Sequence, residues 1–184
     1  RGVRPDAPFQ QPGLSGRCTD RRCVGTQQWR RAGSGQCTIS GNGGVVNQMV
    51  GDGLMAIFGA PQALQDAPLA AARSALDMIG LFNLERVALN KAPIRIGIGI
   101  ASGEVVAGYT GTQQRATYTC IGDTVNLAAR LEAHTKVALR SILVDGRTRH
   151  AVGERIPMEA LGEVLFKGKS AAVPVFALDA PAQR

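Results

Sequence analysis

The distribution of hydrophobic residues changes abruptly near residue 42. Before that point the branched aliphatic residues follow neither the period of a helix nor that of a strand; they are Val3, Leu14, Val24 and Ile39. From Asn42 onward, apolar residues recur in short runs and periodic segments. The pattern predicts an irregular or disordered segment over residues 1–41 and a packed domain over residues 42–180.

Strand and helix signals follow one another in the packed region. The runs GGVVNQMV and LMAIFG flank Gly51-Asp52-Gly53, and Asp-Gly between two such runs is a strong hairpin signal. Downstream, apolar residues at spacings of three to five predict an amphipathic helix over about 66–89. The residues of that apolar face are Leu69, Ala72, Leu76, Ile79, Phe82 and Val87.

The second half of the chain continues this alternation. Isoleucine occupies every second position from 94 to 100, which predicts a strand that turns at Ser102-Gly103. We expect next a short strand within 116–123, a helix over about 124–135, a strand and short helix over 141–152, and an antiparallel pair over 158–168 and 171–178. These elements indicate the α+β class, a mixed or antiparallel sheet with helices packed on one face.

The positive charge is concentrated outside this domain. The chain has a formal charge of +7, and residues 1–41 contain seven arginines against Asp6 and Asp20. Phe9 and Trp29 are the only aromatic residues there, so the stacking platform typical of single-stranded nucleic-acid binding is absent. We expect no nucleic-acid partner.

Targeting and redox signals are weak. The sequence has no run of about 18 apolar residues, and RGVRPDAPFQQPG lacks the apolar middle of a signal peptide. The four cysteines (Cys18, Cys23, Cys37 and Cys120) match no common zinc or disulfide spacing. We expect no membrane span, a cytoplasmic location and reduced thiols.

One polar pair stands out in the stretch CIGDTVNLAARLEAH, residues 120–134. On a helix, Asn126 and Arg130 share one face, while Val125, Leu127, Ala128 and Leu131 supply a packing face. The pair could be an ordinary solvated face, with Arg130 bound to Asp123 or Glu132. A guanidinium beside a carboxamide also suits a phosphate and its sugar, and spacing alone leaves both interpretations open.

Four segments, in this order, resemble class III nucleotidyl cyclases, the adenylate/guanylate cyclase catalytic domain. They are VVNQMVGDGLMAIFGAP (45–61), IGIASGEVVAG (98–108), YTCIGDTVNLAARLE (118–132) and LFKGKSAAVPVFAL (165–178). The resemblance covers about residues 42–178 and implies the ferredoxin-like fold of these cyclases. It also implies conversion of ATP, or GTP, to a cyclic monophosphate and pyrophosphate.

The resemblance assigns roles position by position. Asp52 matches a metal-binding aspartate for Mg²⁺ or Mn²⁺. Asn126 matches the residue that orients the ribose, Arg130 the one that stabilises charge on the transferring phosphate, and Lys167 a contact to the terminal phosphates. Family members share these groups across a dimer, so the resemblance also implies a homodimer.

Gln48 and Thr119 match the two positions that contact the purine. Thr119 favours adenine, whereas the amide of Gln48 can donate and accept and so suits either purine edge. The choice between ATP and GTP stays open on these residues.

The N-terminal part departs from the family. A strand bearing the second metal aspartate, in a phrase like F-x-D-x-x-x-F-T, is not recognisable before Gly43. The first strand and first helices are therefore predicted to be missing or altered, by degradation or by translation of residues 1–41 from a shifted reading frame. Two functions follow: an adenylate cyclase-like enzyme, or an inactive cyclase-like module that binds nucleotide or a cyclase partner.

Overall fold

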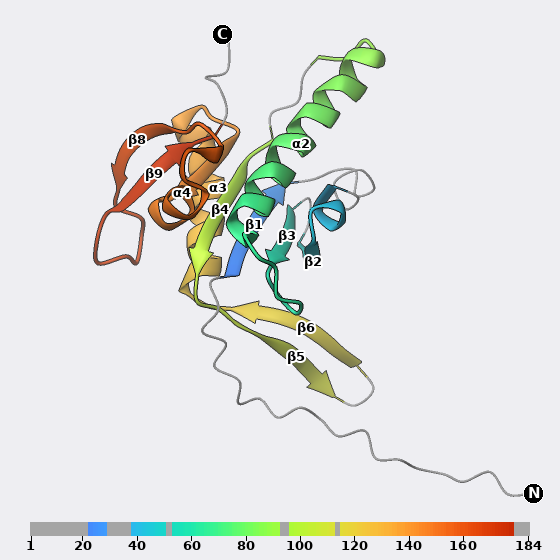
Figure 1. Ribbon diagram of the computed structural model, residues 1–184, viewed down its shortest axis with the longest axis vertical. Coiled ribbons are helices and arrows are strands. Elements are labelled where there is room, and N and C mark those ends of the chain that lie inside the picture. The colour runs from blue at the N-terminus through green and yellow to red at the C-terminus, as the bar shows by residue number, and fades with distance from the viewer. Residues whose placement is uncertain (1–21, 29–37, 51–52, 93–95, 113–114, 179–184) are drawn as a thin grey trace, which may run out of the picture.

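The computed structural model describes residues 22–28, 38–50, 53–92, 96–112 and 115–178 (Figure 1). Its main sheet contains seven strands in the order β2-β3-β1-β4-β7-β9-β8, and β5 and β6 form a separate pair. The strands are β1 (Arg22–Gln28), β2 (Gly44–Val50), β3 (Gly53–Phe58), β4 (Ile98–Gly103), β5 (Val106–Thr112), β6 (Arg115–Ile121), β7 (Ile142–Asp145), β8 (Glu159–Val164) and β9 (Val173–Ala177). The long helices are α2 (Ala67–Ala88) and α3 (Asp123–Ala138), and α4 (Gly146–Val152) is short. The predicted α+β class is confirmed.

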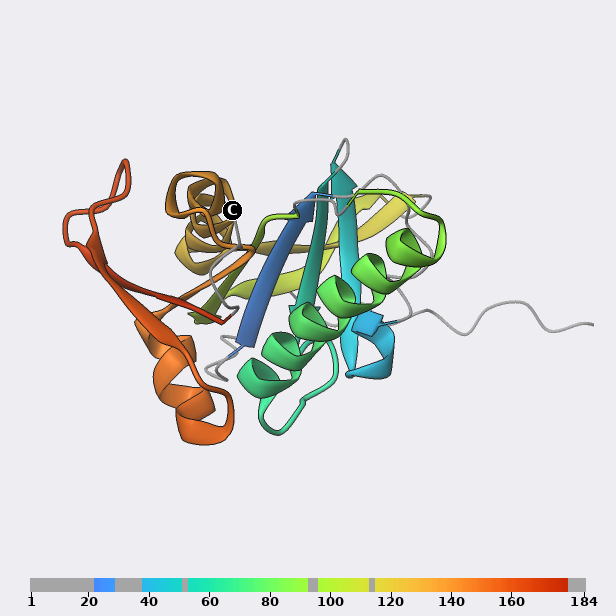
Figure 2. The same cartoon turned by 90° about the horizontal axis from the view of Figure 1, so that it is seen from above.

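Helices cover both faces of the sheet, not one face as the sequence predicted. Side chains alternate along β4, so Ile98 and Ile100 pack toward α2, whereas Ala101 packs toward α3. Figure 2 shows α2 and α3 on opposite sides of the sheet. The central strands β3, β4 and β7 are therefore buried on both sides, which explains their nearly continuous apolar sequences.

The predicted elements of the packed region are confirmed with shifted ends. The helix expected over 66–89 is α2, and the one expected over 124–135 extends to Ala138 in α3. Leu69, Ala72 and Phe82 are buried as predicted, but Val87 is 70% exposed because the end of α2 extends past the sheet (Figure 1). None of the helices in the described part of the chain is long and apolar enough to cross a membrane.

Strand β1 corrects the prediction that residues 1–41 contain no regular element. It lies at the centre of the main sheet, antiparallel to β3 on one side and to β4 on the other. One helical turn follows at 38–41. Backbone pairing with two strands compensates for the weak apolar pattern of RCVGTQQ. The first strand is altered in sequence and not missing, and the predicted boundary at residue 42 remains a prediction.

Glycines on β4 allow α3 to approach the sheet with its backbone. A Cβ placed on Gly99 would lie 2.1 Å from the carbonyl oxygen of Ala128 and 2.3 Å from the amide nitrogen of Glu132. A Cβ on Gly103 would lie 2.6 Å from Oγ1 of Thr124. Only glycine leaves room for this contact, which fixes the height and register of α3 on the strand.

A buried carboxyl group joins β4, β7 and α4. Asp145 caps α4: its Oδ1 accepts from the backbone N–H of Thr148 at 3.0 Å and from the Thr148 hydroxyl at 2.5 Å. The N–H of Ser102 also donates to Oδ1, at 3.3 Å. The Thr148 hydroxyl uses its single hydrogen in the bond to Asp145. The hydroxyl of Ser102 is therefore the donor in its hydrogen bond to Oγ1 of Thr148, at 2.8 Å.

Replacing Asp145 with alanine should lower the free energy of unfolding by about 2 kcal/mol, because the helix cap is lost and buried donors are left without an acceptor. Asp145→Asn keeps an acceptor oxygen and should cost less. Urea unfolding at neutral pH would measure both variants. Equal losses for the two would contradict the assigned role of Oδ1.

The same carboxyl group predicts a pH dependence. Burial raises the pKa of Asp145 above its ordinary value of 3.8, although hydrogen bonds from Thr148 and Ser102 oppose the shift. The folded chain keeps this proton to higher pH than the unfolded chain does, so the corresponding stability is lost as pH rises from about 4 through the raised pKa. Between pH 4 and 7 the stability of the wild type should fall relative to Asp145→Asn, and a constant difference would contradict the raised pKa.

Replacing Gly99 with alanine should destabilise the fold by about 3 kcal/mol, because its Cβ would collide with the backbone of α3. Gly80 is the matched control: it is exposed on α2 with no atom near its Cβ position, so Gly80→Ala should stabilise slightly. Thermal and urea unfolding would compare the two variants. Wild-type stability of Gly99→Ala would show that α3 does not rest on this glycine.

Candidate functional site

Asn126 and Arg130 lie on α3, one turn apart. Asn126 is exposed, whereas Arg130 is half-buried. Of the packing face predicted for this helix, Leu127, Ala128 and Leu131 are buried on the sheet and Val125 is partly buried against the same core. The rest of α3 therefore holds the polar pair at the opposite edge of the helix.

The guanidinium of Arg130 has unused hydrogen-bonding capacity. Its Nη1 is buried and has no hydrogen-bond partner among the described residues. Its Nη2 lies beside Gly168, 3.3 Å from the position that a Cβ would take there. The salt bridges that Arg130 could form with Asp123 or Glu132, one of the two interpretations of the sequence, do not occur among the described ion pairs.

The turn at residues 166–169, called here the 166–169 turn, brings Lys167 to the same edge of α3. The N–H of Lys169 donates to the carbonyl of Phe166 at 3.0 Å and closes the turn, and Gly168 has a φ of +76°. Phe166 is buried and meets His134 of α3 edge-on, with ring centroids 5.6 Å apart. Lys167 is exposed. We call Asn126, Arg130 and Lys167 the α3 site.

An ion pair adjoins the α3 site. The ammonium group of Lys169 binds the carboxylate of Asp123, the first residue of α3. This hydrogen bond, together with the charges of Lys169, Arg130 and Arg147, lowers the pKa of Asp123. The carboxylate is therefore ionised at neutral pH. The sequence prediction missed Lys169, although the Lys-Gly-Lys spacing in LFKGK places two cations on one turn.

The two positions predicted to contact a purine lie on neighbouring strands. Gln48 is exposed on β2, and Thr119 is half-buried on β6. The residues that precede them, Asn47 and Tyr118, join the two strands. Nδ2 of Asn47 donates to the carbonyl oxygen of Tyr118 at 2.7 Å. Asn47 is the bulged residue of β2, between Val46 and Gln48 in the register with β3. No local sequence pattern predicts this contact, because it joins positions 71 residues apart.

The predicted metal ligand cannot be placed, because Asp52 lies outside the described residues. Its neighbour Gly53 pairs with Gln28, the last residue of β1. Strand β1 contains no carboxylate, and it ends in two glutamines that pair with the first residues of β3. The described residues also contain no cluster of three or more His, Cys, Asp or Glu side chains able to hold a metal ion. The described residues alone therefore supply no metal centre.

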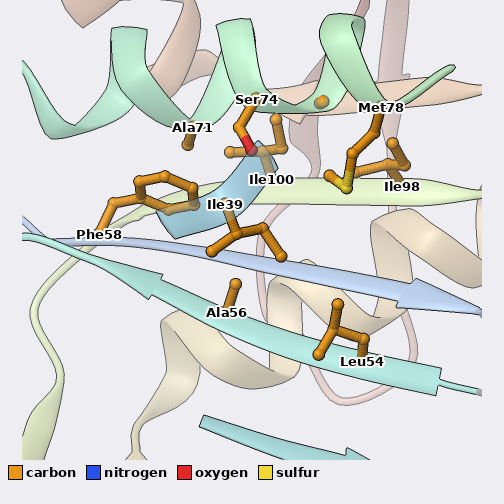
Figure 3. Close-up of a pocket in the computed structure, with 10 residues that line it drawn as sticks. Ile39, Leu54, Ala56, Phe58, Ala71, Ser74, Met78, Ile98 and Ile100 are labelled. Atoms are coloured by element: carbon orange, nitrogen blue, oxygen red, sulfur yellow. The ribbon is translucent and has the colours of Figure 1, made fainter. Parts of the chain in front are cut away.

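A small cavity lies on the other face of the sheet from α3 (Figure 3). It is apolar, has a volume of about 20 Å³, and lies between α2 and strands β3 and β4. Ser74 of α2 is buried there, and its hydroxyl has no hydrogen-bond partner among the described residues. A space of this size holds about one water molecule and is too small for a nucleotide.

Comparison with known proteins relates the sequence to cyclases. The model of the adenylate and guanylate cyclase catalytic domain family matches residues 45–179. An uncharacterized protein of Mycobacterium tuberculosis is 41% identical over 114 residues, which are 60% of this chain and 20% of that protein. Adenylate cyclase 1 of Rhizobium meliloti is 31% identical over 141 residues, which are 75% of this chain and 21% of that protein. The chain thus spans about a fifth of the length of these relatives.

The fold also matches solved structures. The crystal structure of the adenylyl cyclase CyaB from P. aeruginosa aligns with a TM-score of 0.75 at 22% identity, covering 87% of this chain and 94% of that one. The family model spans most of the chain, and the segments that suggested the resemblance fall inside it. The chain therefore belongs to the adenylate and guanylate cyclase catalytic domain family.

Proposed function

We propose that this chain is a purine nucleotide cyclase that converts ATP into cyclic AMP and pyrophosphate, as a homodimer with sites shared between protomers. The observation that supports the proposal best is the guanidinium of Arg130. It is half-buried, its Nη1 has no described partner, and it packs against the turn that carries Lys167. A buried cationic donor without an acceptor favours an anionic ligand, and a triphosphate is such a ligand.

Each member of the α3 site has a distinct role in this proposal. Asn126 holds the ribose, Lys167 contacts the terminal phosphates, and Arg130 stabilises charge on the α-phosphate. The 3′ hydroxyl of the ribose gives its proton to solvent water, and its oxygen bonds to the α-phosphorus. The bond from that phosphorus to the oxygen bridging to the β-phosphate breaks, and pyrophosphate leaves with that oxygen. Positioning and charge stabilisation suffice for such a transfer, so no covalent intermediate on the protein is needed.

The purine is contacted by Gln48 and Thr119. The resemblance to adenylate cyclases favours adenine at Thr119, and the amide of Gln48 can adapt to it by donating or accepting. The bond from Asn47 to Tyr118 supports a common placement of these two positions. ATP is therefore the proposed substrate, with GTP as the poorer one.

A divalent metal, Mg²⁺ or Mn²⁺, neutralises the triphosphate in phosphoryl transfer. The described residues alone supply no metal centre, so each role given above belongs to a side chain of this protein. Asp52 remains the single residue of this chain that is predicted to bind the metal.

A second function is favoured by strand β1. Its sequence RCVGTQQ has no carboxylate, although the α3 site is intact. In this alternative the chain makes no product by itself. It binds nucleotide and completes the site of a second cyclase chain that supplies the metal-binding carboxylates.

Replacing Arg130 or Asn126 with alanine should reduce cyclic AMP production about 100-fold, because each removes a group that acts on the transferring phosphate or its ribose. The assay uses the purified chain with Mn²⁺ and ATP, and then GTP. Arg149→Ala is the control, since it removes an arginine of α4 that pairs with Glu154 at 2.8 Å. Full activity in Arg130→Ala would contradict the proposed site.

Mixing this chain with a second cyclase subunit distinguishes the active cyclase from the inactive module that completes another chain's site. If the chain is inactive alone, it should restore product when mixed with a cyclase subunit mutated at its own Asn and Arg positions. Asp52→Ala should abolish activity of the chain alone and leave complementation in the mixture unchanged. No product in either assay would contradict both functions.

A further inference from the structure

The 166–169 turn is attached to α3 at three separate points. The buried ring of Phe166 contacts His134, and the guanidinium of Arg130 lies against Gly168. At the far end, the ammonium group of Lys169 binds the carboxylate of Asp123. Asp123 and Arg130 are separated by about two helical turns, roughly 10 Å, so the turn spans the N-terminal half of the helix.

The two lysines of the turn have different surroundings. The side chain of Lys169 is 18% exposed and paired with Asp123. Lys167 is exposed and has no partner among the described residues. One lysine is thus used to hold the turn, and the other is left available for a ligand.

We propose that the ion pair between Asp123 and Lys169 is a positioning device for triphosphate binding. By fixing the 166–169 turn on α3, it places Lys167 and Arg130 so that both reach the same phosphate chain. Asp123 and Lys169 are positioning residues in this proposal, since neither touches the substrate. The inference rests on the proposed function of the α3 site.

Coulomb attraction alone predicts the opposite effect of Asp123. Its carboxylate lies among the charges of Lys169, Arg130 and Arg147, and it repels an incoming anion. Removing that negative charge should therefore tighten anion binding if the cations act independently. If the carboxylate is needed to hold the turn, its removal should weaken binding, because the lysines must then be ordered when the ligand binds. Whether anion binding tightens or weakens when the Asp123 charge is removed therefore distinguishes independent cations from a turn held by the ion pair.

The experiment measures binding of inorganic triphosphate, and of ATP, to the full chain by calorimetry at fixed ionic strength. We expect Asp123→Asn and Lys169→Met each to weaken triphosphate binding about three- to five-fold, the range of an exposed ion pair. Asp123→Glu keeps the pair and should bind as the wild type does. Glu154→Gln is the matched control, because it breaks the exposed pair with Arg149, and it should change nothing.

A double variant tests the coupling. If Lys169 acts only through Asp123, the Asp123→Asn, Lys169→Met chain should bind no more weakly than either single variant. A further loss in the double variant would show that Lys169 contacts phosphate itself and would overturn the proposal. Tighter binding by Asp123→Asn, or unchanged binding by both single variants, would also overturn it.

Product formation, read in parallel, separates this proposal from the proposed function. Cyclic AMP made by the wild type and equally by both single variants would leave the function standing and the positioning role refuted. In another outcome, the two single variants bind triphosphate more weakly as expected, while no cyclic AMP forms with the chain alone or mixed with the mutated cyclase subunit. That result would support the positioning role and refute the proposed function. A wild-type chain that binds no triphosphate would overturn both.

Discussion

Direct contact between the backbones of α3 and β4 is the constraint on which the α3 site depends. Because Gly99 carries no side chain, the helix backbone rests on the strand itself, and Gly103 leaves room for the side chain of Thr124. A helix held at backbone distance cannot slide or rotate without a steric clash, so the edge that carries Asn126 and Arg130 has one orientation. The isoleucines at alternate positions of β4 fill the opposite face against α2. One strand therefore anchors a packed core on one side and sets the functional edge of a helix on the other.

The cationic and the acidic parts of the cyclase site differ in how well this chain keeps them. Arg130, Lys167 and Lys169 lie around the first half of α3, and Asp123 is the carboxylate bound among them. Strand β1, by contrast, ends in Gln27 and Gln28 where it meets β3. Amide oxygens are neutral and bind divalent cations less strongly than carboxylates do. In the described part of the chain, the groups proposed to bind an anion are thus in place around α3, whereas strand β1 has no carboxylate.

The sequence predicted those features that depend on local pattern. The periods of 3.6 and 2 residues predicted the positions of α2, α3 and most strands. The sequence motif around Asn126 indicated the family. The sequence did not predict β1, because RCVGTQQ has little apolar pattern and is stabilised by pairing with two strands that come later in the chain. Lys169 was missed for a related reason. Its role appears only when the turn folds back onto Asp123, 46 residues earlier.

The β5–β6 hairpin extends away from the main sheet, as Figure 1 shows, and its outer residues Val106, Tyr109 and Ile121 are about two-thirds exposed. Two-stranded sheets have little stability of their own. The side-chain hydrogen bond described between this hairpin and β2 is the one from Asn47 to Tyr118. Thr119 therefore lies on the protruding hairpin, and Gln48 lies on the main sheet. In the proposed site, a tilt of this hairpin would change the spacing between Thr119 and Gln48, and with it the base preference, while both residues and the entire core stayed unchanged.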